Sequence, residues 1–152
     1  MLPLTLFFYG FLAGCAGLLS QVFFLVLFGK ETDVLSPSLV FLVIAAVVEE
    51  AMRLLFLLQA WRRFGERSFS LPFLILFGLG FATVEIMFAI FLNPQNNLSI
   101  ILLTANTLFH IGATLFLAFG LRRFSFSHPT LLIFLLSSIV AHSLYNIFRL
   151  TQ

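Results

Sequence analysis

Five stretches of almost uninterrupted apolar residues make up most of this 152-residue chain. Each is close to the roughly 20 residues that an α-helix needs to cross a hydrocarbon core about 30 Å thick. In lipid the backbone must satisfy its own polar groups, so such runs form helices. We therefore expect one domain, residues 1–152, that is an all-α integral membrane bundle of about five transmembrane helices. The runs cover residues 3–28, 39–61, 71–92, 98–121 and 130–150.

The composition supports this interpretation and excludes some partners. Hydrophobic residues make up 61% of the chain and charged residues only 9%, against about 25% charged residues in an ordinary soluble domain. The net charge of +2 is too small to indicate nucleic-acid binding, and the basic residues lie in short clusters beside the apolar runs. The expected surroundings are a lipid bilayer and other membrane-embedded molecules, with no nucleic acid.

The distribution of basic residues predicts the orientation. Cytoplasmic loops of membrane proteins carry an excess of Lys and Arg. Only the breaks after the second and fourth runs are clearly basic, which predicts a cytoplasmic N-terminus and a C-terminus outside. We expect a multi-pass protein of a prokaryotic plasma membrane. The basic residues of these two breaks are Arg62, Arg63, Arg67, Arg122 and Arg123.

Three ionisable residues interrupt the second run near its middle. Glu49 and Glu50 are adjacent, and Arg53 follows one helical turn later. Insertion scales put each acidic or basic residue at a helix centre at roughly +2.5 to +3.5 kcal/mol. An ionisable residue at that depth indicates a functional site, and the alternative is a buried ion pair that only fixes helix contacts.

Polar residues at similar depth occur in three of the other runs. In each of the last two runs they are spaced four residues apart, so they share one helix face. Side chains at one depth on four helices can meet in a single interior cavity, where each charge finds a partner or water. These residues are Glu85 in the third run, Asn106, His110 and Thr114 in the fourth, and Ser138, His142 and Asn146 in the fifth.

Such a set suits hydrolysis of a peptide bond by a glutamate-activated water. Neighbouring residues of a helix point about 100° apart, so the two adjacent glutamates cannot do the same job. Arg53 can pair with either of them. The other would face the cavity and act as general base, while a histidine and Asn146 could donate hydrogen bonds to a developing oxyanion.

Four short motifs resemble those of the PrsW-type intramembrane proteases, in order: EEAMR from residue 49, GLGFATVE from 78, HIGAT from 110 and HSLYN from 142. That family belongs to a superfamily with the CAAX prenyl endopeptidases and the multi-spanning scaffold subunit of gamma-secretase. Two positions depart from the PrsW pattern: Ile86 stands where Asn is usual, and Arg53 where Lys is usual.

The resemblance implies catalytic roles for specific residues. Glu49 would be the general base with His110 beside it, and His142 and Asn146 would form the oxyanion site. Glu50 and Glu85 would belong to the catalytic set, and Arg53 and Thr114 would support it. The implied substrate is a membrane-embedded protein or peptide.

Two other functions and one cofactor remain open. The chain could be a non-catalytic scaffold or substrate-binding subunit, or a proton-coupled transporter, since Glu and His chains also relay protons. We expect no cofactor. The alternative is zinc held by Glu49, His110 and His142, residue types that form catalytic zinc sites.

Overall fold

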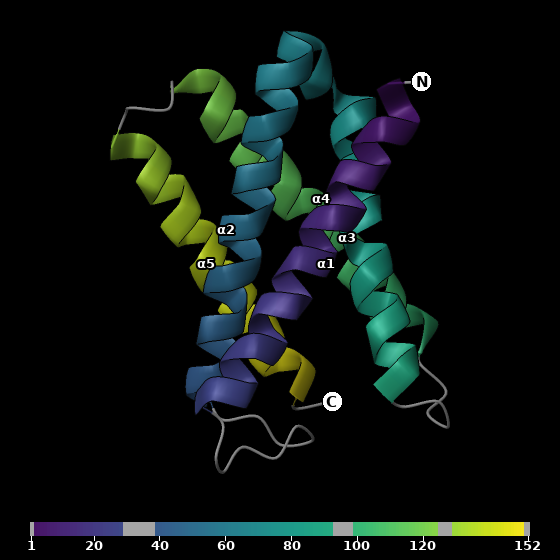
Figure 1. Ribbon diagram of the computed structural model, residues 1–152, viewed down its shortest axis with the longest axis vertical. Helices are drawn as coiled ribbons and strands as arrows, with labels where there is room; N and C mark the ends of the chain where they lie inside the picture. Colours follow the sequence, from purple (N-terminus) through teal and green to yellow (C-terminus); the bar gives the residue numbers. More distant parts are fainter. Residues whose placement is uncertain (1, 29–38, 93–98, 125–128, 151–152) are drawn as a thin grey trace.

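The computed structural model describes residues 2–28, 39–92, 99–124 and 129–150. Within them it contains five long α-helices, one short 3₁₀ helix and no strand, which confirms the all-α bundle (Figure 1). The helices follow the apolar runs closely because each run is helical for the same reason: lipid offers its backbone no hydrogen bonds. They are α1 (Leu2–Phe28), α2 (Leu39–Phe64), η1 (Gly65–Phe69), α3 (Leu71–Leu92), α4 (Ile100–Arg123) and α5 (Pro129–Leu150).

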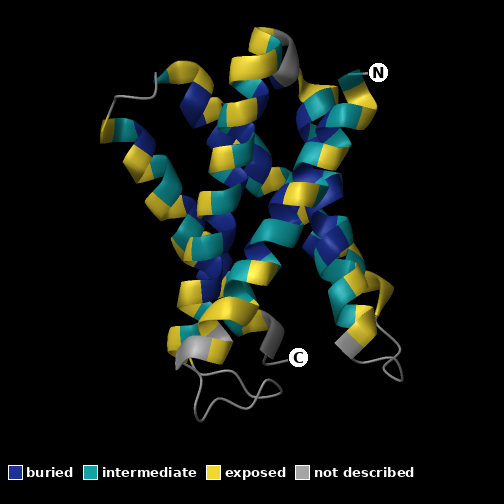
Figure 2. Cartoon of the chain, in the orientation of Figure 1, coloured by how far each residue is buried: buried dark blue, intermediate teal, exposed yellow. Residues whose placement is uncertain are grey.

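The five helices form a closed ring in the order α1, α2, α5, α4, α3. Helix α1 packs closely against α3 as well as α2, and α2 also touches α4 across the ring. Figure 1 shows α1 and α2 at the front, α5 at the left and α4 behind them. The ring places one face of every helix toward a common interior, where the buried residues gather (Figure 2).

Four of the helices are long and apolar enough to cross a membrane: α1, α3, α4 and α5. Helix α2 is not among them, although it has 26 residues and lies within the same bundle. At 1.5 Å per residue its length is about 39 Å, enough for a membrane core. It is set apart by Glu49, Glu50 and Arg53, three charged side chains close together near its middle, all of which are buried by the other helices.

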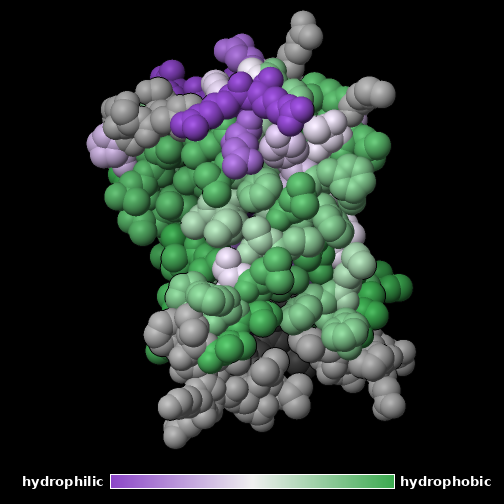
Figure 3. Space-filling model, viewed as in Figure 1, coloured by the Kyte–Doolittle hydropathy of each residue, from purple (hydrophilic) through white to green (hydrophobic). Residues whose placement is uncertain are grey.

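Hydrophilic side chains collect at one end of the bundle, above a broad apolar band (Figure 3). Arg62 and Arg63 end α2 there, Arg122 and Arg123 end α4 there, and all four are exposed. The N-terminal end of α1 lies at this end and the C-terminal end of α5 at the opposite one (Figure 1). This arrangement agrees with the orientation expected from the basic residues, and the side of the membrane stays a prediction.

Glycines allow α1 and α3 to approach very closely. A Cβ added at Gly10 would lie 1.9 Å from the carbonyl oxygen of Phe77, and one at Gly80 would lie 2.1 Å from that of Phe7. Small residues at a helix interface permit such backbone contact in membranes. Further along the same face of α1, a Cβ at Gly17 would lie 3.2 Å from Cγ of Glu49, so the glycine stripe also brings α1 against the charged centre of α2.

Gly10→Ala should therefore destabilise the protein by about 1–3 kcal/mol, because the added methyl group overlaps a backbone carbonyl that cannot swing away. Thermal unfolding in detergent, followed by circular dichroism, measures the change. Gly112→Ala is the matched control, since a Cβ at that position meets no atom within 4 Å. Equal midpoints for the two variants would contradict the packing described here.

Candidate active site

Glu50 is the most completely bonded of the buried carboxylates. It is 0% exposed and pairs with Arg53, one turn later in α2. Two groups from α5 complete its surroundings: Oγ of Ser138 donates to Oε2 at 2.6 Å, and Nδ1 of His142 lies 2.7 Å from Oε1. The Arg53 guanidinium, the Ser138 hydroxyl and the His142 imidazole all contact Glu50. Glu50 therefore links α5 to α2 and orients the His142 ring.

Arg53 extends this network to the fourth helix. Its guanidinium lies 4.2 Å from the centre of the Phe81 ring, and its second terminal nitrogen, Nη2, lies 2.6 Å from Nδ1 of His110. A guanidinium can only donate, so Nδ1 of His110 accepts. A neutral imidazole that accepts at Nδ1 carries its proton on Nε2. Arg53 therefore fixes the tautomer of His110 as well as neutralising Glu50.

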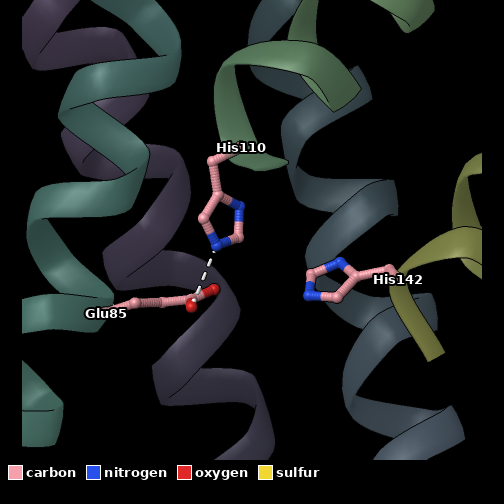
Figure 4. Close-up of side chains that lie close together, drawn as sticks. All are labelled: Glu85, His110 and His142. Carbon is pink, nitrogen blue, oxygen red and sulfur yellow. Dashed lines mark ion pairs between the residues drawn. The ribbon is translucent and has the colours of Figure 1, made fainter. Parts of the chain in front are cut away.

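His110 in turn meets the carboxylate of α3. Its Nε2 lies 2.9 Å from Oε2 of Glu85, the contact drawn in Figure 4, and the ring stacks on Phe81 with centroids 5.1 Å apart. His142 approaches from α5 on the other side, with 5.5 Å between the two imidazole centroids. One face of each of α2, α3, α4 and α5 thus contributes to a single buried cluster.

Glu49 has a different environment from its neighbour. One oxygen accepts a hydrogen bond from the side-chain amide of Gln21 in α1. The other, Oε2, lies 3.2 Å from Nε2 of His142 and makes no well-aligned hydrogen bond. The Glu85 carboxyl also interacts directly with Glu49. Glu49 is therefore anchored at one oxygen and presents the other toward the histidines and Glu85.

The cluster as a whole contains more acid than base. Three carboxyl groups face one guanidinium and two imidazoles. If all three carboxyls were ionised and both imidazoles neutral, two negative charges would lie uncompensated in a low-dielectric interior, which is costly. Protons shared within the cluster or a divalent cation must supply the balance.

The structure brings together five of the six residues expected to be catalytic, and Arg53 with them. It pairs Arg53 with Glu50, and it places His142 beside Glu49, where the resemblance implied His110. Thr114 is buried and its hydroxyl donates to the backbone carbonyl of His110 at 2.8 Å. The sixth, Asn146, is half-buried one turn after His142 and makes no hydrogen bond within the described residues.

Two contributions to the site escaped the sequence analysis. Gln21 of α1 bonds to Glu49, so all five long helices supply a polar side chain. Its signal was present: Gln21 follows Gly17 by four residues and so continues the glycine stripe of α1. Ser138, which the sequence placed on the polar face of the fifth run without a specific role, donates directly to Glu50. Its position four residues before His142 pointed to the same face.

Several of these side chains also fit a metal ion. Ligand atoms of Glu85, His110 and His142 lie within 4.8 Å of one another. His142 suits this role, because a ring that donates from Nδ1 to a carboxylate, here Glu50, leaves Nε2 for a metal. His110 suits it less, since Arg53 occupies its Nδ1 and leaves the proton on Nε2. Glu49 offers the oxygen Oε2 that has no aligned partner.

The chain was compared with known proteins. Residues 1–151, essentially the whole chain, match a family described as PrsW family intramembrane metalloprotease. No curated protein and no solved structure gives a significant match.

Replacing Arg53 should cost more stability than any other single change in the cluster. Arg53→Met leaves Glu50 buried with its charge uncompensated, and breaking a buried ion pair in this way costs about 3–5 kcal/mol. The double variant Arg53→Met with Glu50→Gln should recover part of that loss, because both charges are then gone. Thermal unfolding in detergent tests this, and an unchanged midpoint for Arg53→Met would be inconsistent with the network.

Proposed function

Because the chain belongs to the PrsW family of intramembrane proteases, we propose that it is an endopeptidase that hydrolyses membrane-embedded protein or peptide substrates with a water activated by Glu49. The observation that carries this proposal is the asymmetry of the glutamate pair. Glu50 is saturated by partners, whereas Glu49 is anchored through one oxygen and presents the other toward a histidine.

In the proposed reaction Glu49 removes a proton from a water molecule bound at Oε2. The water oxygen attacks the peptide carbonyl carbon, and a tetrahedral oxyanion forms. When the C–N bond breaks, the proton held by Glu49 passes to the leaving nitrogen, so the products are a carboxyl group and an amine. A base must lie within hydrogen-bond reach of the proton that it takes, which Gln21 ensures by fixing the carboxylate.

The histidines have distinct proposed tasks. His142 lies between Glu49 and Glu50, where a proton on each ring nitrogen would find a carboxylate acceptor. In that form it would donate from Nε2 to the oxyanion, aided by the amide of Asn146 one turn away, as the resemblance implies. His110, held by Arg53 and Glu85, would position the opposite wall.

A purely structural ion pair explains only part of the cluster. It accounts for Glu50 with Arg53, which join α2 to the helices around it. It does not account for Glu49, whose second oxygen gains no aligned partner from its burial. A buried polar atom without a partner costs free energy, and Nε of Arg53 shares that status with Oε2 of Glu49. What favours a reactive role for Glu49 is that its unpartnered atom is a carboxylate oxygen 3.2 Å from Nε2 of His142.

A metal-assisted reaction is the second candidate, favoured by the family's description and by the donor cluster. Glu85, His142 and Glu49 would hold the ion, for the reasons of tautomer given above. A bound divalent cation would polarise the substrate carbonyl and activate a water. The cation would also compensate the excess of carboxylates.

Glu49→Gln should lower the rate of substrate cleavage by about 10²–10⁴-fold, the usual contribution of a general base. The neutral amide can still accept from Gln21, so the thermal midpoint should not fall. Cleavage of a fluorogenic single-span peptide in phosphatidylcholine vesicles measures the rate. Glu66→Gln, at an exposed residue of η1, is the matched control. Full activity of Glu49→Gln would refute the role of Glu49.

Metal content separates the two chemical routes. For the glutamate-only route we expect protein purified without chelators to contain far less than one zinc ion per chain, as measured by elemental mass spectrometry. A chelator should then leave the rate of cleavage unchanged. Stoichiometric zinc that is lost in His142→Ala, together with cleavage, would instead establish the metal-assisted route. His128→Ala, at the remaining histidine of the sequence, controls for loss of a ring alone.

A further inference from the structure

A groove with a volume of about 320 Å³ lies between α4 and α5. These two helices pack least closely of the neighbouring pairs in the ring. The volume is at the lower end of the range for ligand sites, about 300–1,000 Å³. Its lining is mostly apolar and includes several small side chains. The residues used below are Phe109, Gly112, Ala113, Ser137, Ser138 and Ala141.

The groove is continuous with the candidate active site. Ser138 lines it and also donates to Glu50 at 2.6 Å. Phe109 lines it as well, and its ring lies 5.0 Å from that of His142 and 5.5 Å from that of His110. These two side chains form the wall that the groove and the charged cluster share. An occupant of the groove would therefore lie next to the reactive residues.

The Ser137 hydroxyl indicates that a molecule bound in the groove should provide a hydrogen-bonding group. The other serine and threonine hydroxyls of the spans whose bonds are described donate either to a carbonyl four residues earlier or, for Ser138, to Glu50. Within the described residues the Ser137 hydroxyl makes no hydrogen bond, although it lines the groove. A lipid acyl chain cannot satisfy it, whereas a peptide backbone can.

Gly112 shows how closely the occupant approaches. At most helical glycines of this chain an added Cβ would meet a neighbouring helix; at Gly78, for example, it would lie 2.7 Å from the backbone of Ile111. At Gly112 it would meet nothing within 4 Å. Packing within the chain therefore does not require this glycine. Together with Ala113 and Ala141 it leaves room for a second backbone at van der Waals distance.

We propose that the α4–α5 groove is the substrate-binding site of this protease and that it takes a locally unwound peptide segment from the membrane. The proposal rests on the function proposed above. Unwound backbone in a membrane needs polar partners, and Ser137 supplies one beside the catalytic cluster. A peptide entering from the lipid at this point would pass Ser137 first and reach Ser138, Phe109 and then His142.

Photo-cross-linking tests the site without requiring catalysis. The probe is a synthetic 25-residue apolar peptide with a central Gly-Pro break and a diazirine-bearing leucine beside it, reconstituted with Glu49→Gln protein in phosphatidylcholine vesicles. Mass spectrometry should locate most adducts in residues 108–116 and 137–141. A phosphatidylcholine with a diazirine on its acyl chain is the competing probe. Labelling of the groove by this lipid that the peptide does not displace would overturn the proposal, as would adducts spread evenly over all helices.

Filling the groove should block the peptide. Gly112→Leu should reduce groove adducts at least tenfold and, in protein with Glu49 intact, raise the KM for cleavage while leaving the thermal midpoint unchanged. Ser137→Ala should raise KM about three- to tenfold, the effect of one lost hydrogen bond. Ala51→Leu, the same kind of enlargement on an exposed face of α2, is the control and should change neither. Unaltered adducts in Gly112→Leu would refute the site.

The two proposals can fail separately. If wild-type protein cleaves no peptide but the groove still captures the probe and Gly112→Leu prevents capture, the binding site stands and the protease function falls. If cleavage proceeds and depends on Glu49, yet Gly112→Leu cleaves with an unchanged KM, the function stands and the groove is not its entrance.

Discussion

The cost of burying charge governs this structure. Three carboxyl groups and a guanidinium lie in the interior of an apolar bundle, and each ion removed from water costs several kcal/mol unless other polar groups replace its hydration. No single helix can meet that requirement. Arg53 compensates Glu50, α5 supplies Ser138 and His142, and α1 supplies Gln21. The ring of five helices can be understood as the arrangement that brings enough donors to one place.

This requirement also separates two residues that are chemically identical and adjacent in sequence. Glu50 points to the side where a guanidinium, a hydroxyl and an imidazole converge, and there it serves as a fixed support. Glu49, turned about 100° away, meets an amide and the far nitrogen of the same imidazole. His142 touches both carboxylates, at 2.7 and 3.2 Å. A change at either glutamate is therefore transmitted to the other through one ring.

The sequence predicted the helices and most of the cluster, because lipid allows few alternatives and helical spacing fixes which polar residues share a face. It could not predict the pairing inside the cluster. Arg53 can reach either glutamate from its own helix. Which of the two it pairs with depends on how α2 crosses α5, and that crossing selects Glu50. The placement of His142 rather than His110 beside Glu49 depends on the ring order of helices, which periodicity does not encode. Gln21 was missed because a single amide in an apolar run forms no pattern with other polar residues and so does not indicate a site.

The composition of α2 has a consequence for how the protein is made. With three charges at roughly 2.5–3.5 kcal/mol each, this helix is a poor candidate for entering the bilayer alone as it leaves the ribosome. Of the helices that supply partners to these charges, α1 with Gln21 precedes α2, whereas α4 with His110 and α5 with Ser138 and His142 are synthesised later. We therefore expect α2 to settle in the bilayer only after these downstream partners have emerged. The same residues that form the buried cluster would make the insertion of α2 depend on helices synthesised after it.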